Sequence, residues 1–356
     1  MGIISLTMIV KNEQSNLSRC LLSAREYVDE IIIVDTGSID ETKKIAIEHE
    51  ARVYDFIWTN SFAEARNYAL QQATGDWILV LDADEHLAPE TAHHIREFTA
   101  GPPAIGRVTI VSKYHDNGEI RYTRTPISRL FPRGVYYKGN IHEQVISDLP
   151  HRLTGVTVYH DGYYETVKTE RNLPLLQQAL LQDPESPYLN MQLAREWKNK
   201  QLFKEADHYF SKAYRLATGN EGYYSNLVVD YLYNLVKIGK LEEGYEVIQG
   251  EQEALSMSPD FFFAAGMFYM DYVLGNVAAH LDKLPLIETS FLRCLELGER
   301  KENGGVMGTG SFLAAYNLGV YYEVVGETAK ALHYYQLSAR QKYAKAIERL
   351  QLLSNG

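Results

Sequence analysis

The sequence feature that most constrains the fold is a regular alternation of short apolar segments and helical patterns near the start of the chain. The apolar segments span residues 3–10, 30–35, 52–56 and 77–82. The helical patterns between them span residues 14–27, 40–50 and 61–73. This repetition predicts an α/β domain whose mainly parallel sheet is covered by helices on both faces. Because such sheets bind ligands beyond the carboxyl ends of their strands, the residues that directly follow each strand are the first candidates for function.

The segment at residues 101–165 has a different character. It is rich in Gly, Pro and Tyr and contains short alternating stretches at 106–113, 119–124 and 127–132. This texture predicts antiparallel strands and a flap over an active site. Two polar groups stand out in it: His142-Glu143, and His160 at the end of a late strand.

Beyond Lys168 the patterns are helical throughout. Small and aromatic residues recur there at the offsets of a helical-hairpin repeat of about 34 residues, in which each unit packs on the next. The two best copies are Ala194, Trp197, Ala206, Phe210 and Ala213, and Gly319, Tyr322, Ala331, Tyr335 and Ser338. Residues 255–300 are irregular and fit a longer helix pair. We expect the α/β domain over residues 1–168 and an all-α, tetratricopeptide-like repeat domain over residues 169–356, with an ordinary helical bundle as the alternative.

Composition and charge narrow the classes of function. Apolar residues make up 46% of the chain, enough for a sizeable core, and the net charge of -11 argues against a broad attraction to nucleic acid or an anionic membrane. No apolar run approaches the roughly 20 residues of a transmembrane helix, and the apolar start lacks the basic residues and cleavage site of a signal peptide. Cys20 and Cys294 suggest neither a disulfide framework nor a metal site. The cytoplasm is the expected compartment, and the oligomeric state stays open.

The clearest chemical motif is Asp82-Ala83-Asp84, which directly follows an apolar strand. Its carboxylates are hard oxygen ligands, which suit Mn²⁺ or Mg²⁺ bound together with substrate phosphates. We expect Asp84 to be a metal ligand and Asp82 to hold a ribose or a metal-bound water. His160 is expected to supply an imidazole to the same metal or a hydrogen bond to phosphate, with a buried structural histidine as the alternative.

Other polar residues fall at the same edge of the predicted sheet. Asp35 ends the second strand, where its carboxylate can accept hydrogen bonds from a nucleobase or a ribose. Thr7 and Glu13 flank the same crevice, with a helix-capping role for Glu13 as the alternative. Arg66 projects from the third helix toward this edge, where a guanidinium can bind phosphate; a surface ion pair with a neighbouring acid is its alternative.

Six motifs occur in a fixed order: T-M-I-V-K-N-E, I-V-D-T-G-S-x-D-x-T, F-A-E-A-R-N, D-A-D-E, G-N-I-H-E and V-Y-H-D-G-Y. Together they resemble the family 2 glycosyltransferases of the GT-A fold, and the subgroup fused to tetratricopeptide repeats is the most similar. The resemblance implies a nucleotide-sugar donor, usually a UDP-sugar. The donor-site residues that it implies are Thr7, Asp35, Arg66, Asp82, Asp84 and His160. In such enzymes the residue matching Asp35 contacts the nucleoside and the residue matching Asp84 holds the metal.

The catalytic base departs from the family pattern. Many members carry a Glu-Asp pair whose Asp is the base, whereas this chain has His142-Glu143 instead. We expect Glu143 to deprotonate an acceptor hydroxyl and His142 to orient it or to contact the donor phosphate, with inversion at the anomeric carbon. A thiol acceptor would need less help from a base, because it is already partly ionised near neutral pH.

Several acceptors and two other classes of protein stay open. The same motifs with a helical tail also resemble bacterial S-glycosyltransferases that modify a cysteine of a bacteriocin precursor peptide, while related domain pairs are implied to act on surface glycans, lipid-linked sugars or proteins. Because repeat solenoids offer a groove for peptides, we expect a peptide or protein acceptor. The alternatives are a repeat-based adaptor with an inactive GT-A domain and a nucleotidyltransferase, which would need a Gly-rich phosphate loop that the first strand does not lead into.

Overall fold

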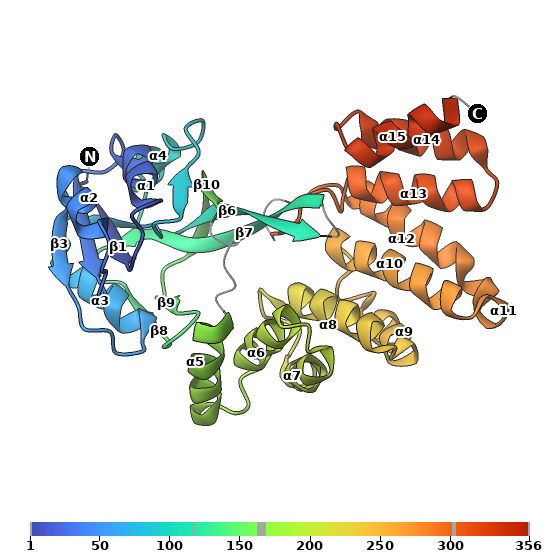
Figure 1. Cartoon of the computed structure of the whole chain (residues 1–356), viewed down its shortest axis with the longest axis horizontal. Helices are drawn as coiled ribbons and strands as arrows, with labels where there is room; N and C mark the ends of the chain where they lie inside the picture. Colours follow the sequence, from blue (N-terminus) through green and yellow to red (C-terminus); the bar gives the residue numbers. More distant parts are fainter. Residues whose placement is uncertain (1, 117–118, 162–168, 301–303, 355–356) are drawn as a thin grey trace. The chain divides into compact units, whose positions relative to one another are not determined.

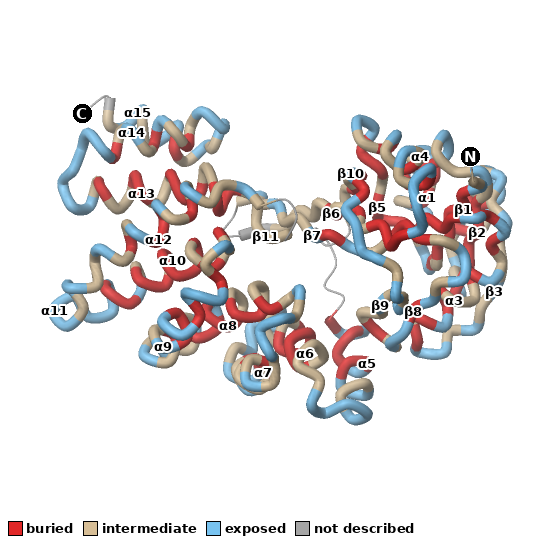
Figure 2. The backbone as a smooth tube through the Cα atoms, turned by 180° about the vertical axis from the view of Figure 1, so that it is seen from behind, coloured by how far each residue is buried: buried red, intermediate tan, exposed pale blue. Residues whose placement is uncertain are grey.

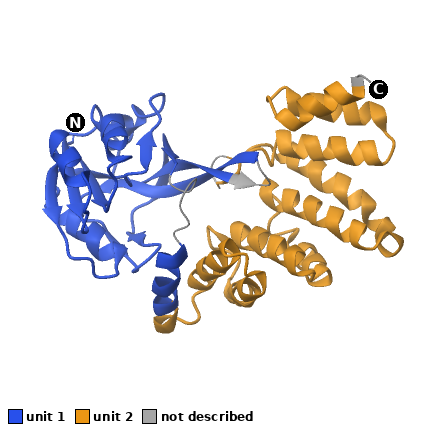
Figure 3. Cartoon of the chain, viewed as in Figure 1, with its two compact units in different colours: residues 1–179 blue, residues 180–356 orange. Residues whose placement is uncertain are grey.

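The structure is a computed structural model of the chain and describes residues 2–116, 119–161, 169–300 and 304–354. The chain divides into two compact units, Met1–Ala179 and Leu180–Gly356 (Figure 3). The sequence places the domain boundary after residue 168. Because residues 162–168 lie outside the described residues, that boundary stays a prediction.

The first unit begins with parallel strands joined by helices (Figure 1). The strands are β1 (Ile4–Val10), β2 (Glu30–Asp35), β3 (Arg52–Asp55) and β4 (Trp77–Val80). The helices are α1 (Leu17–Ala24), α2 (Thr42–Glu48) and α3 (Phe62–Gln72). β1 pairs in parallel with β2 and β4, and β2 pairs in parallel with β3. The predicted α/β domain with a mainly parallel sheet is confirmed.

The rest of the first unit extends the same sheet. Its elements are β5 (Glu85–Leu87), α4 (His94–Thr99), β6 (Ile105–Asp116), β7 (Glu119–Pro132) and β10 (His151–His160). The strands lie in the order β3-β2-β1-β4-β7-β6-β10-β5. β7 runs antiparallel to β4 and β6, as predicted, and the two stretches expected at 119–124 and 127–132 form this single long strand. A separate two-stranded sheet joins β8 (Tyr136–Lys138) to β9 (Gln144–Ile146).

Alternate residues of the central strands face opposite sides of this sheet, so both faces are covered. Ile31 and Ile33 of β2 belong to a buried cluster with residues of α1 and α2, whereas Ile32 belongs to a second cluster with Ala63 and Leu70 of α3. Figure 2 shows the resulting burial along β1 and β2. With both faces closed by helices, the carboxyl edge of the sheet is where polar side chains can gather.

The second unit is built from helices. After α5 (Thr169–Gln182), which crosses the division between the units, they are α6 (Pro187–Asn199), α7 (Phe203–Leu216), α8 (Tyr224–Ile238), α9 (Leu241–Glu251), α10 (Pro259–Gly275), α11 (Val277–His280), the 3-10 turn η1 (Leu281–Lys283), α12 (Leu284–Leu297), α13 (Phe312–Val324), α14 (Thr328–Ala339) and α15 (Ala344–Ser354). Successive helices pack as hairpins, α6 with α7 and α13 with α14 among them. The longer helix pair expected within 255–300 is α10 and α12.

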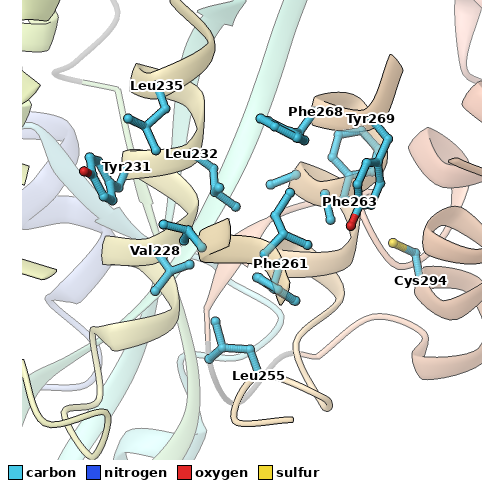
Figure 4. Close-up of a cluster of buried hydrophobic side chains, with 14 of the residues drawn as sticks. Val228, Tyr231, Leu232, Leu235, Leu255, Phe261, Phe263, Phe268, Tyr269 and Cys294 are labelled. Atoms are coloured by element: carbon cyan, nitrogen blue, oxygen red, sulfur yellow. The ribbon is translucent and has the colours of Figure 1, made fainter. Parts of the chain in front are cut away.

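Close approach of neighbouring helices in this unit depends on glycine facing an aromatic ring. The pairs are Gly244 of α9 with Phe268 of α10, Gly266 of α10 with Phe291 of α12, and Gly319 of α13 with Tyr335 of α14. A Cβ atom at each glycine would lie less than 3.0 Å from the ring. Figure 4 shows the apolar core around Phe268, where side chains of α8 and α10 meet. Of these residues, Gly319 and Tyr335 also belong to the small and aromatic positions by which the sequence marks the repeats.

The expectation of helix throughout the second unit is wrong at one place. Gly305 and Val306 form a short extended segment, β11 (Gly305–Val306). Gly304 and Gly305 have φ angles of 76° and 118°, values outside the right-handed helix, so the chain leaves helical geometry there. Cys20 and Cys294 are buried free thiols. None of the described helices combines the length and apolar character that crossing a bilayer requires.

Candidate functional site

The first part of the site is a carboxylate beside an imidazole at the carboxyl edge of the sheet. Asp84 lies in the turn between β4 and β5, and His160 ends β10. Antiparallel pairing places His160 opposite Glu85, next to Asp84 in the chain. Asp84 Oδ2 and His160 Nε2 lie 3.3 Å apart, and the other ring nitrogen of His160, Nδ1, is 3.2 Å from Ser112 Oγ. The structure therefore brings together the two residues predicted to hold a metal.

The second part is a buried ionic network around Asp82. Arg66 Nη2 donates to Asp82 Oδ1 at 2.8 Å, and Arg129 Nη2 donates to Asp82 Oδ2 at 2.7 Å. Arg66 also donates through Nε to Glu143, and Arg129 donates to Glu85 at 3.1 Å. The alternative of a surface ion pair for Arg66 is thus wrong, because its side chain is only 8% exposed and its partners are Asp82 and Glu143.

The charges of this network follow from its hydrogen bonds. Burial opposes the ionisation of Asp82, but the guanidiniums of Arg129 and Arg66 outweigh it and hold the pKa of Asp82 well below its ordinary value. Burial raises the pKa of Glu85, and Arg129 opposes that rise only in part. Asp82 is therefore ionised and paired with two guanidiniums. Glu85, in contrast, binds its proton more tightly than an ordinary glutamate does.

Two buried side-chain atoms, one at the end of β2 and one in this network, can still form a hydrogen bond with a ligand. Among the described residues, Asp35 Oδ2 and Arg66 Nη1 have no hydrogen-bond partner. Asp35 Oδ1, in contrast, accepts from the amides of Gly37 at 3.0 Å and Ser38 at 2.8 Å. One oxygen of Asp35 thus fixes the turn after β2, and the other remains able to accept a hydrogen bond. Arg66 Nη1 is a donor that suits a phosphate oxygen.

The remaining predicted residues take varied positions. Glu143 and its neighbour His142 lie in the turn between β8 and β9, where His142 has a φ angle of 50°. Thr7 is buried inside β1. Glu13 precedes α1, its carbonyl accepts from the amides of Asn16 and Leu17, and its amide donates to Thr42 Oγ1 at 2.7 Å. These are contacts of the Glu13 backbone, while the N-cap residue of α1 is Asn16, whose Nδ2 donates to the Glu13 carboxylate at 3.0 Å.

Two residues of the site escaped the sequence reasoning. Arg129 sits in β7 next to buried Leu130 and Phe131, and the sequence does not distinguish it from the other charged residues of that strand. Lys43 of α2 lies with Nζ 3.9 Å from Asp35 Oδ1 and also pairs with Asp55 at the end of β3. Lys43 had no signal, because exposed lysines are common on helices.

The donor set at Asp84 and His160 fits a divalent cation. A carboxylate oxygen and an imidazole nitrogen 3.3 Å apart can both reach one ion at about 2.1 Å with little movement. Ordered contacts hold each of them, since Asp84 O accepts from the amide of Asp161 at 3.3 Å and Ser112 contacts the His160 ring. Mn²⁺ accepts such a mixed oxygen and nitrogen set, whereas Mg²⁺ prefers oxygen alone.

Comparison with known proteins relates the first part of the chain to a known family of enzymes. Residues 5–157 match the family model described as Glycosyl transferase family 2. A TPR repeat-containing protein of Synechococcus elongatus is 41% identical over 151 residues, which are 42% of this chain and 37% of that protein. The prophage-derived glycosyltransferase SunS of Bacillus subtilis is 28% identical over 229 residues, 59% of this chain and 53% of that protein. The chain therefore spans about half or less of the length of these relatives.

Solved structures show only a remote likeness. Glucosyl-3-phosphoglycerate synthase of Mycobacterium tuberculosis, crystallised with Mn²⁺, UDP and phosphoglyceric acid, matches with a TM-score of 0.28 at 24% identity, over 31% of this chain and 43% of that one. Overlap of this extent says nothing about the site. Residues 5–157 therefore match a family 2 glycosyltransferase domain, and a region of packed helical hairpins follows it.

Proposed function

Starting from a family 2 glycosyltransferase domain joined to a tetratricopeptide-like helical region, we propose that the chain is an inverting, metal-dependent glycosyltransferase. Its donor is a nucleotide diphosphate sugar, UDP-sugar first among the candidates. Its acceptor is a side chain of a peptide or protein, cysteine included. The observation that carries the proposal is the pairing of Asp84 with His160 beside a buried ionic network at the carboxyl edge of the sheet.

The donor is held by buried polar atoms that have no hydrogen-bond partner among the described residues. Asp35 Oδ2 accepts a hydrogen bond from the nucleoside, and Arg66 Nη1 donates to the diphosphate. Asp84 and His160 would hold Mn²⁺ or Mg²⁺, which when bound neutralises the charge that develops on the leaving diphosphate. Asp82 keeps Arg66 in place through the bond between its Oδ1 and Arg66 Nη2. The arginine is thus oriented before the donor arrives.

Glu143 is the proposed base. Its carboxylate lies beside Arg66 and can take the proton of an acceptor hydroxyl as that oxygen attacks the anomeric carbon from the face opposite the diphosphate. One carbon–oxygen bond forms while the bond to the leaving phosphate oxygen breaks, which inverts the anomeric carbon. His142 precedes Glu143 in the same turn and is proposed to orient it or to contact phosphate. The helical region is proposed to bind the acceptor polypeptide.

The test is calorimetric titration of UDP in the presence and absence of Mn²⁺, followed by hydrolysis of UDP- and GDP-sugars. We expect metal-dependent UDP binding by the natural chain and a loss of at least about tenfold in affinity with Asp84→Ala, because a metal ligand is removed without opening a core cavity. Exposed Asp148 of the same unit is the control, and Asp148→Ala should bind as the natural chain does.

A second variant distinguishes the binding of the nucleoside from the binding of the metal. Asp35→Ala should weaken UDP binding in the presence and absence of Mn²⁺ alike, because it removes an acceptor for the base or ribose and no metal ligand. Unchanged UDP affinity would exclude Asp35 from the nucleoside site. If the natural chain binds no UDP and hydrolyses no donor with either metal, the domain is inactive and the repeat-based adaptor becomes the better account.

A further inference from the structure

The turn that carries Glu143 belongs to a small sheet of its own. β8 and β9 pair antiparallel, with Tyr137 opposite Val145 and Lys138 opposite Gln144. An isolated two-stranded sheet is only marginally stable in water. The position of Glu143 therefore depends on what ties this hairpin to the rest of the unit.

Asn67 of α3 provides such a tie. Its Nδ2 donates to the carbonyl of Tyr137 at 2.9 Å, and its Oδ1 accepts from the amide of Tyr137 at 2.8 Å. One side-chain amide thus satisfies both backbone groups of a single residue of β8, as a neighbouring strand would. Only an amide has a donor and an acceptor in this arrangement, since aspartate lacks the donor and leucine lacks both.

The same helix holds the turn at a second point and supplies the partner of Glu143. The amide of Phe62, at the start of α3, donates to the carbonyl of Asn140 at 2.8 Å. Arg66, directly before Asn67 in α3, donates to Glu143. Because three contacts run from one rigid helix to one hairpin, a shift of the hairpin along α3 would move Glu143 off Arg66.

From this geometry we propose that Asn67 is a positioning residue, whose amide fixes the β8–β9 hairpin in register with α3 and thereby sets Glu143 on Arg66. That this register serves catalysis rests on the proposed function of Glu143; the positioning itself does not. Tyr137 also packs its ring against Phe131, with centroids 5.9 Å apart, and lies near Arg66. This packing keeps the hairpin attached without the amide, so loss of Asn67 changes its register and exchange instead of unfolding the unit.

The variants are Asn67→Leu, which removes both hydrogen bonds at similar size, and Asn67→Asp, which keeps only the acceptor. The matched control is Asn190→Leu, which also removes a buried amide bonded to the backbone, at the carbonyl of Ser186. Hydrogen exchange of residues 136–146 is measured in the full chain. We expect faster exchange there with Asn67→Leu, a smaller change with Asn67→Asp and none with Asn190→Leu. Unchanged exchange in Asn67→Leu overturns the proposal.

The catalytic part is tested by a double-mutant cycle with Glu143→Gln. Asn67→Leu should lower kcat of sugar transfer at least about tenfold while the KM for the donor stays within about twofold, because misplacement of a reacting group falls on the chemical step. In the Glu143→Gln background the same change should cost no more than about twofold. Independent, multiplying losses would show that Asn67 does not act through Glu143. A natural chain with no turnover would refute the proposed function, and hydrogen exchange would still decide the role of Asn67.

Discussion

The two aspartates of Asp82-Ala83-Asp84 have different surroundings although they stand one residue apart. Asp82 is bonded to Arg66 and Arg129, whereas Asp84 faces His160. The negative charge of Asp82 is already balanced by two guanidiniums, which weakens its attraction for a metal cation. Asp84 is therefore the better candidate for a metal ligand. Asp82 is better understood as the group that orients the arginines. The sequence contains the pair, but only the spatial arrangement of the arginines separates the two roles.

At the residue scale we predict that Glu143→Gln lowers transfer to a hydroxyl acceptor at least about 10²-fold while UDP affinity changes little. Glutamine keeps the shape and one acceptor oxygen for Arg66 but cannot take the proton. Initial rates at saturating donor, with UDP titration alongside, measure the two effects separately.

The pH profile of this variant also reports the acceptor class. If the acceptor is a thiol, its thiolate fraction grows with pH, and the Glu143→Gln activity should recover in part at alkaline pH. A hydroxyl acceptor gives no such recovery. Near-natural transfer to a hydroxyl would make Glu143 structural, and Glu85, whose pKa burial raises, would then be examined as the base.

At the element scale, the start of α10 holds a second unusual acid. Burial raises the pKa of Asp260 to about 6, although hydrogen bonds from the amide of Val306 and the hydroxyl of Thr309 oppose the rise. The folded pKa lies above the ordinary value, so the stability that this acid contributes is complete below about pH 4 and is lost as pH rises through about 6.

The stability of Asp260→Asn relative to the natural chain should therefore increase with pH. The difference in the free energy of unfolding should change by about 2 kcal/mol between pH 4.5 and 7.5. The amide keeps an acceptor for Val306 and cannot ionise. Hydrogen-exchange protection of α10 measures the local free energy of opening in both chains. The exposed Asp183→Asn serves as control, and a gap between natural chain and Asp260→Asn that is the same at both pH values would contradict the assignment.

The sequence predicts elements that depend on local patterns better than elements that depend on contacts between distant residues. The strands β1 to β4 and the helix pairs follow from local patterns, because apolar spacing directly reflects which faces are buried. The hairpin of β8 and β9 and the ionic partners of Arg66 do not, since they depend on contacts between residues such as Asn67 and Tyr137 that are far apart in the chain. Motif order located the candidate site residues, while their pairing needed the tertiary structure.

At the scale of the whole molecule, the donor-site candidates all belong to the first unit, which ends at Ala179. We predict that a chain ending at residue 179 still hydrolyses a UDP-sugar but loses transfer to the natural polypeptide acceptor. Ending there retains Arg171 of α5, which lies over the ring of Phe62 at the start of α3. Donor hydrolysis and acceptor transfer are measured on both chains, and undiminished transfer by the shorter one would show that the helical region is not the acceptor platform.

The glycines that face aromatic rings in the second unit have a consequence for protein engineering. Tables of helix propensity rank alanine above glycine by about 1 kcal/mol, so an optimisation guided by such tables would replace Gly244, Gly266 and Gly319 first. Each replacement would drive a methyl group into Phe268, Phe291 or Tyr335 and push two helices apart. At these positions alanine would destabilise the protein although the tables favour it. A designer should therefore leave each glycine and its facing aromatic ring unchanged together.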